Sequence, residues 1–132
     1  MVFVLMEWDS KYELGHDRID AEHRIFLSLI MDFEEALSQD ASKEKLNRIL
    51  KELTKYAKFH FVSEENIMAE HNYPDLEKHA YLHLMLLTEV RNYSNQFMND
   101  MVEATEVFGF LFNWFAFHTV TEDKKLIGFI GK

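Results

Sequence analysis

The chain has 132 residues, of which 48% are hydrophobic and 14% aromatic. At roughly 100–200 residues per domain, this length predicts one domain over residues 1–132, and the apolar content argues against disorder. The sequence contains no Cys, which excludes disulfides, thiolate zinc sites, iron–sulfur clusters and cysteine nucleophiles.

The charge balance and the hydropathy pattern exclude further classes. Fourteen basic residues stand against 23 acidic ones, for a net charge of −9. An acidic chain without a basic stripe is a poor candidate for binding nucleic acid or an anionic membrane. No apolar run approaches the ~20 residues that span a bilayer. The apolar start, residues 1–6, is short and runs into Glu7 without a basic leader, so we expect no signal peptide and a cytoplasmic location.

The first part of the chain divides into an arm and a helix. Residues 1–16 show no sustained period and predict an extended N-terminal arm. From Ile19 to Leu37 apolar residues recur at helical spacing, which predicts a first helix. Asp17 or Asp20 is the expected cap of that helix, and the polar segment 38–42 is expected to end it.

Three more apolar stripes follow, over residues 46–68, 79–97 and from about 103 toward 124, with breaks near Pro74 and Asn99. One Pro and four Gly leave few helix breakers. Four helices of roughly twenty residues joined by short loops predict an all-α, antiparallel up-down four-helix bundle over residues 17–127.

Histidines and acids lie on these apolar stripes, with at least one histidine per helix: His23, His60, His79, His83 and His118, accompanied by Glu64 and Asp123. Helical residues four apart differ in direction by about 40°, so the pairs His60/Glu64 and His79/His83 can each close on one metal. Buried carboxylates and imidazoles need partners, and a central cation would satisfy both. This set exceeds the needs of one tetrahedral zinc and suits two octahedral-type ions. Its nitrogen and oxygen donors allow iron, manganese, cobalt or zinc.

Helix geometry leaves open which acid of the last helix accompanies His118 at the metal site. Glu122 is four residues after His118 and lies near the same face, whereas Asp123 is five residues on and about 140° away on an ideal helix. Regular geometry favours Glu122, and a distorted last turn would favour Asp123.

The order and spacing of these residues resemble the seven-ligand signature of the hemerythrin family, in particular its prokaryotic single-domain members. The series is His23, His60-x-x-x-Glu64, His79-x-x-x-His83 and His118-x-x-x-x-Asp123, with Glu7-Trp8, Ile19-Asp20, Phe61, Glu65 and Tyr73-Pro74 in agreement. The resemblance covers essentially the whole chain, and it selects Asp123 over Glu122.

The resemblance implies a non-haem di-iron centre that binds dioxygen reversibly. It implies that one iron is coordinatively saturated and is held by His79, His83 and His118. The other iron would keep an open coordination position and be held by His23 and His60. The two irons would be bridged by Glu64, Asp123 and a solvent-derived oxo or hydroxo group. The expected walls of the oxygen pocket are Phe26, Phe61, Trp114 and Thr119. Thr119 is smaller and more polar than the bulky aliphatic residue common there, and His16 also departs from the family pattern.

The remaining histidines, Glu65 and the apolar run of the last helix are expected not to bind metal. His16 and His71 lie in polar, loop-like contexts and are expected not to be ligands. Glu65 is expected to face solvent or, at most, to lie behind a ligand. The apolar run 108–117 is expected to form core and pocket, with Phe112 and Phe117 packing sideways against a helix or a second subunit.

The function expected from this reading is dioxygen carriage, storage or delivery by a protein that is not an enzyme. We expect a monomer or small homo-oligomer that binds neither nucleic acid nor membrane. The alternatives are oxygen or redox sensing through a separate partner, and a di-iron oxidase, peroxidase, nitric-oxide-handling or iron-handling protein.

Overall fold

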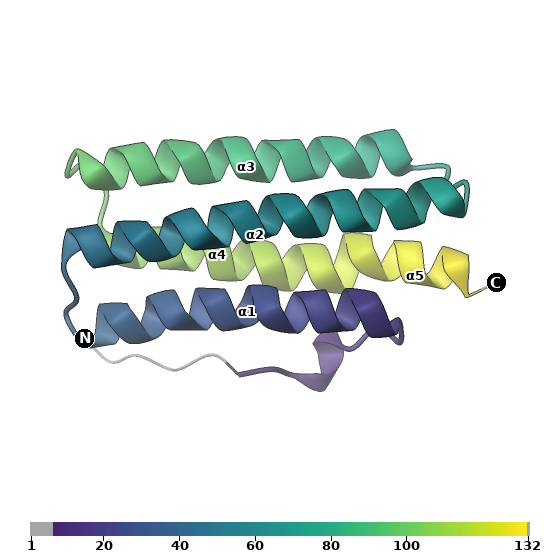
Figure 1. Cartoon of the computed structure of the whole chain (residues 1–132), viewed down its shortest axis with the longest axis horizontal. Coiled ribbons are helices and arrows are strands. Elements are labelled where there is room, and N and C mark those ends of the chain that lie inside the picture. Colours follow the sequence, from purple (N-terminus) through teal and green to yellow (C-terminus); the bar gives the residue numbers. More distant parts are fainter. Residues whose placement is uncertain (1–6, 132) are drawn as a thin grey trace.

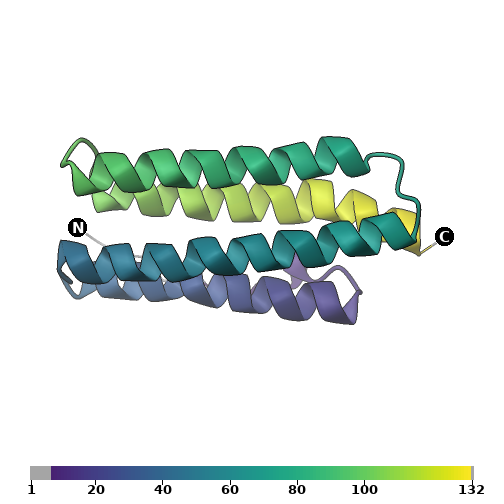
Figure 2. The same cartoon turned by 45° about the horizontal axis from the view of Figure 1, so that its top comes forward.

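The structure, a computed structural model, describes residues 7–131, and over that range it contains helices and no strand. Its elements are η1 (Ser10–Tyr12), α1 (Asp17–Ser38), α2 (Lys43–Glu70), α3 (Leu76–Met98), α4 (Ala104–His118), η2 (Thr119–Asp123) and α5 (Lys124–Ile130). Successive long helices run antiparallel, with α1 beside α2, α2 beside α3, and α4 beside both α3 and α1 (Figures 1 and 2). The predicted all-α, up-down four-helix bundle is confirmed.

The described part of the N-terminal arm lies along the outside of α1 (Figure 1). It contains the single turn η1 and buries the ring of Tyr12, which meets Phe115 edge-on at 5.3 Å. Residues 1–6 of the predicted arm lie outside the described residues.

The start of α1 differs from expectation, because its cap is His16 rather than Asp17 or Asp20. The Nδ1 atom of His16 accepts a hydrogen bond from the backbone N–H of Ile19. Asp20 is already inside the helix, and its buried carboxylate reaches back to accept from the backbone N–H groups of Leu14 and Gly15 at 2.9 and 3.0 Å. Gly15 has a φ of +90°, which glycine adopts without strain.

The helix that begins with α4 also runs further than predicted. After the η2 segment it continues through α5 to Ile130, beyond the expected end near residue 124. Leu126 is fully buried in this extension, so tertiary packing outweighs the low helix propensity of Gly128.

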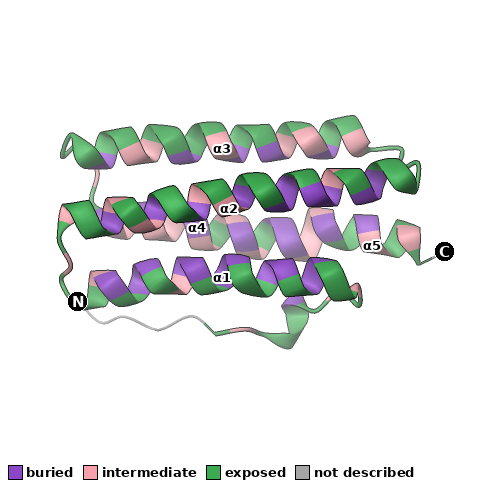
Figure 3. Cartoon of the chain, viewed as in Figure 1, coloured by how far each residue is buried: buried purple, intermediate pink, exposed green. Residues whose placement is uncertain are grey.

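The bundle buries its apolar side chains in two clusters of unequal size. The larger contains Phe33, Leu53 and Leu111, and the smaller contains Ile19 and Leu126. Figure 3 shows the buried residues of α3 along its inward side, while its outward side is exposed. Along each of the four long helices, the predicted ligand positions fall between residues of these two clusters. The polar residues therefore lie inside the bundle, with apolar packing on both sides.

The aromatic run of α4 contributes mainly to the bundle interior. Leu111 and Phe115 are buried, as expected, and the partly buried Phe112 stacks parallel to Phe108 at 6.2 Å. Phe117 differs from the expectation of packing against a helix, because it is 66% exposed. Within residues 7–131, no helix combines the length and the hydropathy that crossing a membrane requires.

Candidate metal centre

The structure brings all seven predicted side chains together in the bundle interior. Their candidate ligand atoms fall into two groups, in each of which all atoms lie within 4.8 Å of one another. One group contains Glu64, His79, His83, His118 and Asp123, and the other contains His23, His60, Glu64 and Asp123. All seven residues are buried. Glu64 and Asp123 belong to both groups, as carboxylates shared between two ions would.

Glu64 lies at the centre of the cluster, where its two oxygens face imidazoles of its own helix and of two others. Its Oε1 atom is 2.8 Å from Nε2 of His79 and 3.3 Å from Nε2 of His83. Its Oε2 atom is 3.5 Å from Nε2 of His60, one turn earlier on α2, and 3.8 Å from Nε2 of His23. One carboxylate thus faces imidazoles from α1, α2 and α3.

The η2 segment decides which acid of the last helix reaches the cluster. It is a π-helical stretch, in which backbone hydrogen bonds join residues five apart rather than four. One turn therefore takes more residues than in a regular α-helix, and Asp123 returns to the face of His118, with Oδ1 3.1 Å from Nε2 of His118. Glu122 turns away and pairs with Lys125 at 3.4 Å. The regular-helix geometry that favoured Glu122 does not apply to this turn.

The charges within the cluster stabilise one another. Burial, and for Glu64 the nearby charge of Asp123, would raise the pKa of both carboxyls, but the surrounding imidazoles outweigh this and hold both pKa values below their usual range. Burial would lower the pKa of His23 and His79, but Asp123 and Glu64 raise these pKa values to about 10 and about 9. A cation bound among these residues would replace the protons that the raised pKa values of His23 and His79 favour.

Unpaired polar atoms show that the cluster fits metal ions better than a network of hydrogen bonds. Both carboxylate oxygens of Glu64 and Nε2 of His83 are buried without a hydrogen-bond partner among the described residues. These atoms nevertheless lie within about 4 Å of other donors, which is the arrangement of ligand atoms aimed at a common centre. Buried polar groups without partners are rare and need an explanation. Imidazole nitrogen and carboxylate oxygen, without thiolate, suit iron among other divalent ions.

Two further carboxylates hold the imidazoles from behind. Glu22 is buried and accepts hydrogen bonds from Nδ1 of His60 at 2.7 Å and from Oγ of Ser63 at 2.8 Å. Glu65 accepts from Nδ1 of His83 at 2.8 Å, so it lies behind a ligand candidate rather than facing solvent alone. Carboxylates in this position fix the ring orientation and the tautomer of a metal-binding histidine.

Sequence reasoning missed Glu22, although this residue stands three positions after Ile19 and four before Phe26 and is buried on the inward side of α1, because a lone acid beside an apolar stripe ordinarily faces solvent. A weak signal was present in its spacing from Arg18, with which it forms an i,i+4 ion pair at 3.1 Å. On its own, an i,i+4 ion pair indicates only charged residues on a helix surface. The contact between Glu22 and His60 joins residues 38 positions apart, and it requires the folded structure to be recognised.

Aromatic rings cover the cluster on the side of the larger apolar cluster. Phe61 stacks on His83 at 3.9 Å, and Trp114 stacks on His118 at 4.4 Å. Phe26 lies 6.3 Å from Phe61 and 6.1 Å from Trp114. Three of the four expected pocket walls thus form one aromatic group, and the fourth, Thr119, is buried immediately after His118.

The two histidines expected not to be ligands lie elsewhere. His16 caps α1, and His71 caps the end of α2, with its Nδ1 atom 2.9 Å from the carbonyl oxygen of Ile67. Neither belongs to either group of candidate ligands found among residues 7–131.

Taken together, the bundle and its buried histidine–carboxylate cluster define a metal-binding four-helix-bundle protein. The sequence profile of the hemerythrin HHE cation binding domain matches residues 14–130. The chain therefore belongs to the hemerythrin family, whose members bind a di-iron centre with which the buried cluster is compatible.

The chain is similar to known hemerythrins in sequence and in fold. It is 28% identical to a bacteriohemerythrin from Clostridium acetobutylicum, an alignment that covers 91% of this chain and 97% of the relative. It is 29% identical to a myohemerythrin from Theromyzon tessulatum, over 63% of this chain and 66% of the relative. A crystal structure of wild-type hemerythrin superposes with a TM-score of 0.82 at 21% identity, over 92% of this chain and 94% of the other. At that identity the superposition shows the shared fold.

Proposed function

We propose that the chain binds dioxygen reversibly at a non-haem di-iron centre and serves in oxygen carriage, storage or delivery. The proposed ligands are His23, His60, Glu64, His79, His83, His118 and Asp123. The observation that carries the proposal is the pair of buried donor groups that share Glu64 and Asp123. Two groups with common carboxylates suit two ions side by side, whereas a single ion would use only one of them.

The unequal size of the two groups supports an open position on one ion. The group around His79, His83 and His118 has five donors, and the group around His23 and His60 has four. With the shared carboxylates counted in both, the second ion has one protein ligand fewer. We infer that a small molecule such as dioxygen binds on that side.

The surroundings of the site favour binding over turnover. When bound, the di-iron centre supplies the electrons that dioxygen takes up and gives back. Two ferrous ions would bring a charge of +4, which the carboxylates of Glu64 and Asp123 would reduce to +2 and a solvent-derived hydroxide to +1, so most of the buried charge would be compensated. The rings of Phe26, Phe61 and Trp114 exclude water from one side of the cluster.

The donor set also separates this chain from di-iron enzymes with a related bundle. Ferritin-like di-iron sites use mainly Glu with Glu-x-x-His motifs. Here five of the seven proposed ligands are histidines, and neutral imidazoles stabilise the ferrous state better than added carboxylates do. We infer reversible binding rather than an oxidase reaction.

The test is an iron analysis combined with optical spectra of the purified chain, recorded through repeated cycles of deoxygenation and air. We expect two irons per chain and a visible band that appears with air and disappears without it. Glu64→Ala should lose iron and the band, while the matched control His71→Ala should keep both. Steady oxygen consumption with release of product would instead make the protein an oxidase. A partner affinity that changes with oxygenation would make it a sensor.

A further inference from the structure

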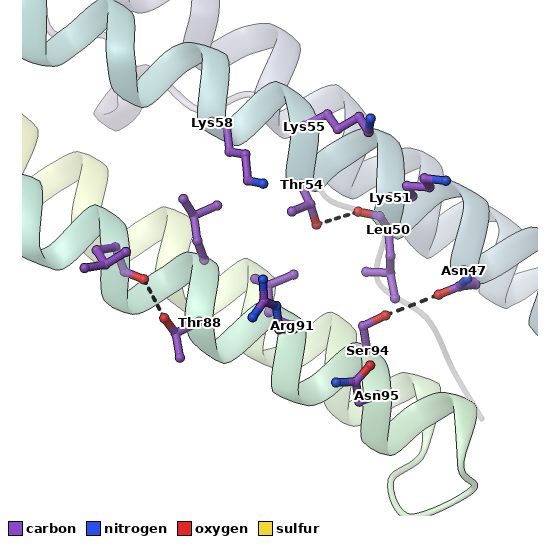
Figure 4. Close-up of a pocket in the computed structure, with 13 residues that line it drawn as sticks. Asn47, Leu50, Lys51, Thr54, Lys55, Lys58, Thr88, Arg91, Ser94 and Asn95 are labelled. Atoms are coloured by element: carbon purple, nitrogen blue, oxygen red, sulfur yellow. Dashed lines mark hydrogen bonds between the residues drawn. The ribbon is translucent and has the colours of Figure 1, made fainter.

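A groove with a volume of about 610 Å³ lies between α2 and α3. Figure 4 shows Lys51, Lys55 and Lys58 along its α2 side, with Arg91 of α3 opposite. We call this feature, defined by those four side chains, the basic groove. Its volume falls in the range of ordinary binding sites.

The charge of the basic groove opposes that of the chain. The net charge of the chain is −9, yet the groove lining contains four cations and no Asp or Glu. None of the four cations takes part in an ion pair among residues 7–131, in contrast to Arg24 and Lys43, which pair with acids elsewhere. The expectation that the chain lacks a basic stripe is therefore wrong. The net charge gives no sign of this local basic surface. The three lysines share one face of α2 because they are spaced at i, i+4 and i+7 along the helix.

The groove also presents apolar surface, and its three hydroxyl groups already have hydrogen-bond partners. Leu84 of α3 lines the groove and is 59% exposed. The hydroxyls of Thr54 and Thr88 donate to backbone carbonyls of their own helices, and Ser94 donates to Asn47 across one end (Figure 4). What the groove offers an occupant is therefore a row of cations above exposed apolar surface.

The length of the cation row decides between kinds of occupant. Seven residues of helix span about 10 Å, so the three lysines are too spread for one small anion to contact them all. All four cations are exposed, and no buried polar side chain converges on a point as a small-anion site requires. A long polyanion or an anionic membrane would meet the acidic remainder of the chain and be repelled. A partner with locally placed negative charge avoids both difficulties.

We propose that the basic groove docks an acidic amphipathic helix of a partner protein. Carboxylates at i, i+4 and i+7 on such a helix would match the spacing of Lys51, Lys55 and Lys58, and its apolar residues would cover Leu84. A helix lying in a groove between two helices is a common mode of recognition. This proposal does not rest on dioxygen binding, so either can fail without the other.

The test uses a fluorescein-labelled, 14-residue helical peptide with Glu at i, i+4 and i+7 and Leu on the adjoining face. Its binding to the full chain is measured by fluorescence anisotropy at low and at physiological salt. We expect saturable binding that weakens with salt. Lys55→Glu combined with Lys58→Glu should weaken it about tenfold or more, because each reversal replaces an attraction by a repulsion.

The matched control is Lys11→Glu combined with Lys45→Glu, which changes the net charge equally on exposed residues outside the groove lining. It should change the affinity less than about twofold, and circular dichroism should show both variants folded. Equal weakening by both pairs would reduce the binding to general charge attraction and overturn the proposal. Binding of a peptide with Gln in place of Glu at full affinity would also overturn it, as would efficient displacement of the peptide by inorganic tripolyphosphate.

Discussion

Replacing Glu22 by Ala removes the carboxylate that lies behind His60. In the folded chain this carboxylate accepts from Nδ1 of His60 at 2.7 Å and from Oγ of Ser63 at 2.8 Å, with all three residues buried. The variant leaves two buried donors without an acceptor and frees the His60 ring to rotate. We therefore expect two separate losses, one in stability and one in metal affinity.

The contacts set the size of each loss. A buried donor left unsatisfied costs about 1–3 kcal/mol, so the free energy of unfolding should fall by at least about 2 kcal/mol. Removing a carboxylate behind a metal-binding histidine typically costs about 10–100-fold in metal affinity, which is about 1.4–2.7 kcal/mol. The ion pair with Arg18 adds little, because the Arg18 side chain is mostly exposed.

The assay is a metal titration of the purified chain against a chromophoric chelator. We expect the Glu22→Ala variant to lose affinity at one of two sites, the site of His60, and to keep the other. Glu65→Ala, which removes the equivalent carboxylate behind His83, should cost less, because Glu65 is 32% exposed and water can replace it. Two sites of unchanged affinity in Glu22→Ala would refute the reasoning that this carboxylate positions a ligand.

Three further predictions concern the core, the π segment and pH. Leu53→Asp puts a charge in the larger apolar cluster and should cost about 5 kcal/mol or more, so thermal melting should show a largely unfolded chain, whereas Leu84→Asp on the surface should melt normally. Asp123→Asn should lower iron per chain, while Glu122→Gln should not, because only Asp123 faces the cluster. In the metal-free protein, the raised pKa of His23 favours the protonated folded state. Its stabilising contribution should be complete below about pH 6.5 and lost as the pH rises through about 10, as urea denaturation would measure.

The melting curve, the iron content and the urea midpoint can each contradict the corresponding prediction. A native melting curve for Leu53→Asp would show that the apolar stripe of α2 does not face the core. Equal iron content in the Asp123→Asn and wild-type chains would remove Asp123 from the proposed ligands. A urea midpoint that does not fall between pH 6.5 and pH 10.5 would show that His23 is not held protonated in the metal-free fold.

The bundle could be predicted from the sequence because each long helix carries its own apolar stripe. The pairs His60/Glu64 and His79/His83 followed from the same repeat, since residues four apart on a regular helix share a face. The prediction that His23 and His118 lie beside these pairs depended on the up-down topology of the bundle. That topology was expected because the loops between the helices are short.

What the sequence could not reveal depends on departures from the regular repeat or on distant contacts. The inward turn of Asp123 requires the π segment of η2, whose onset no residue type in the sequence announces. The capping of α1 by His16 and the role of Glu22 are settled by contacts that a periodicity argument does not contain. The basic groove became visible only when the lysines of α2 were placed opposite Arg91 of α3.

We propose that one chain holds two iron ions in a single buried cage. Diffraction from crystals of the iron-loaded protein, recorded at the iron absorption edge, tests it most directly. We predict two anomalous peaks per chain, one beside His23 and His60 and one beside His79, His83 and His118. A single peak, or a map in which these imidazoles point into solvent, would contradict the account.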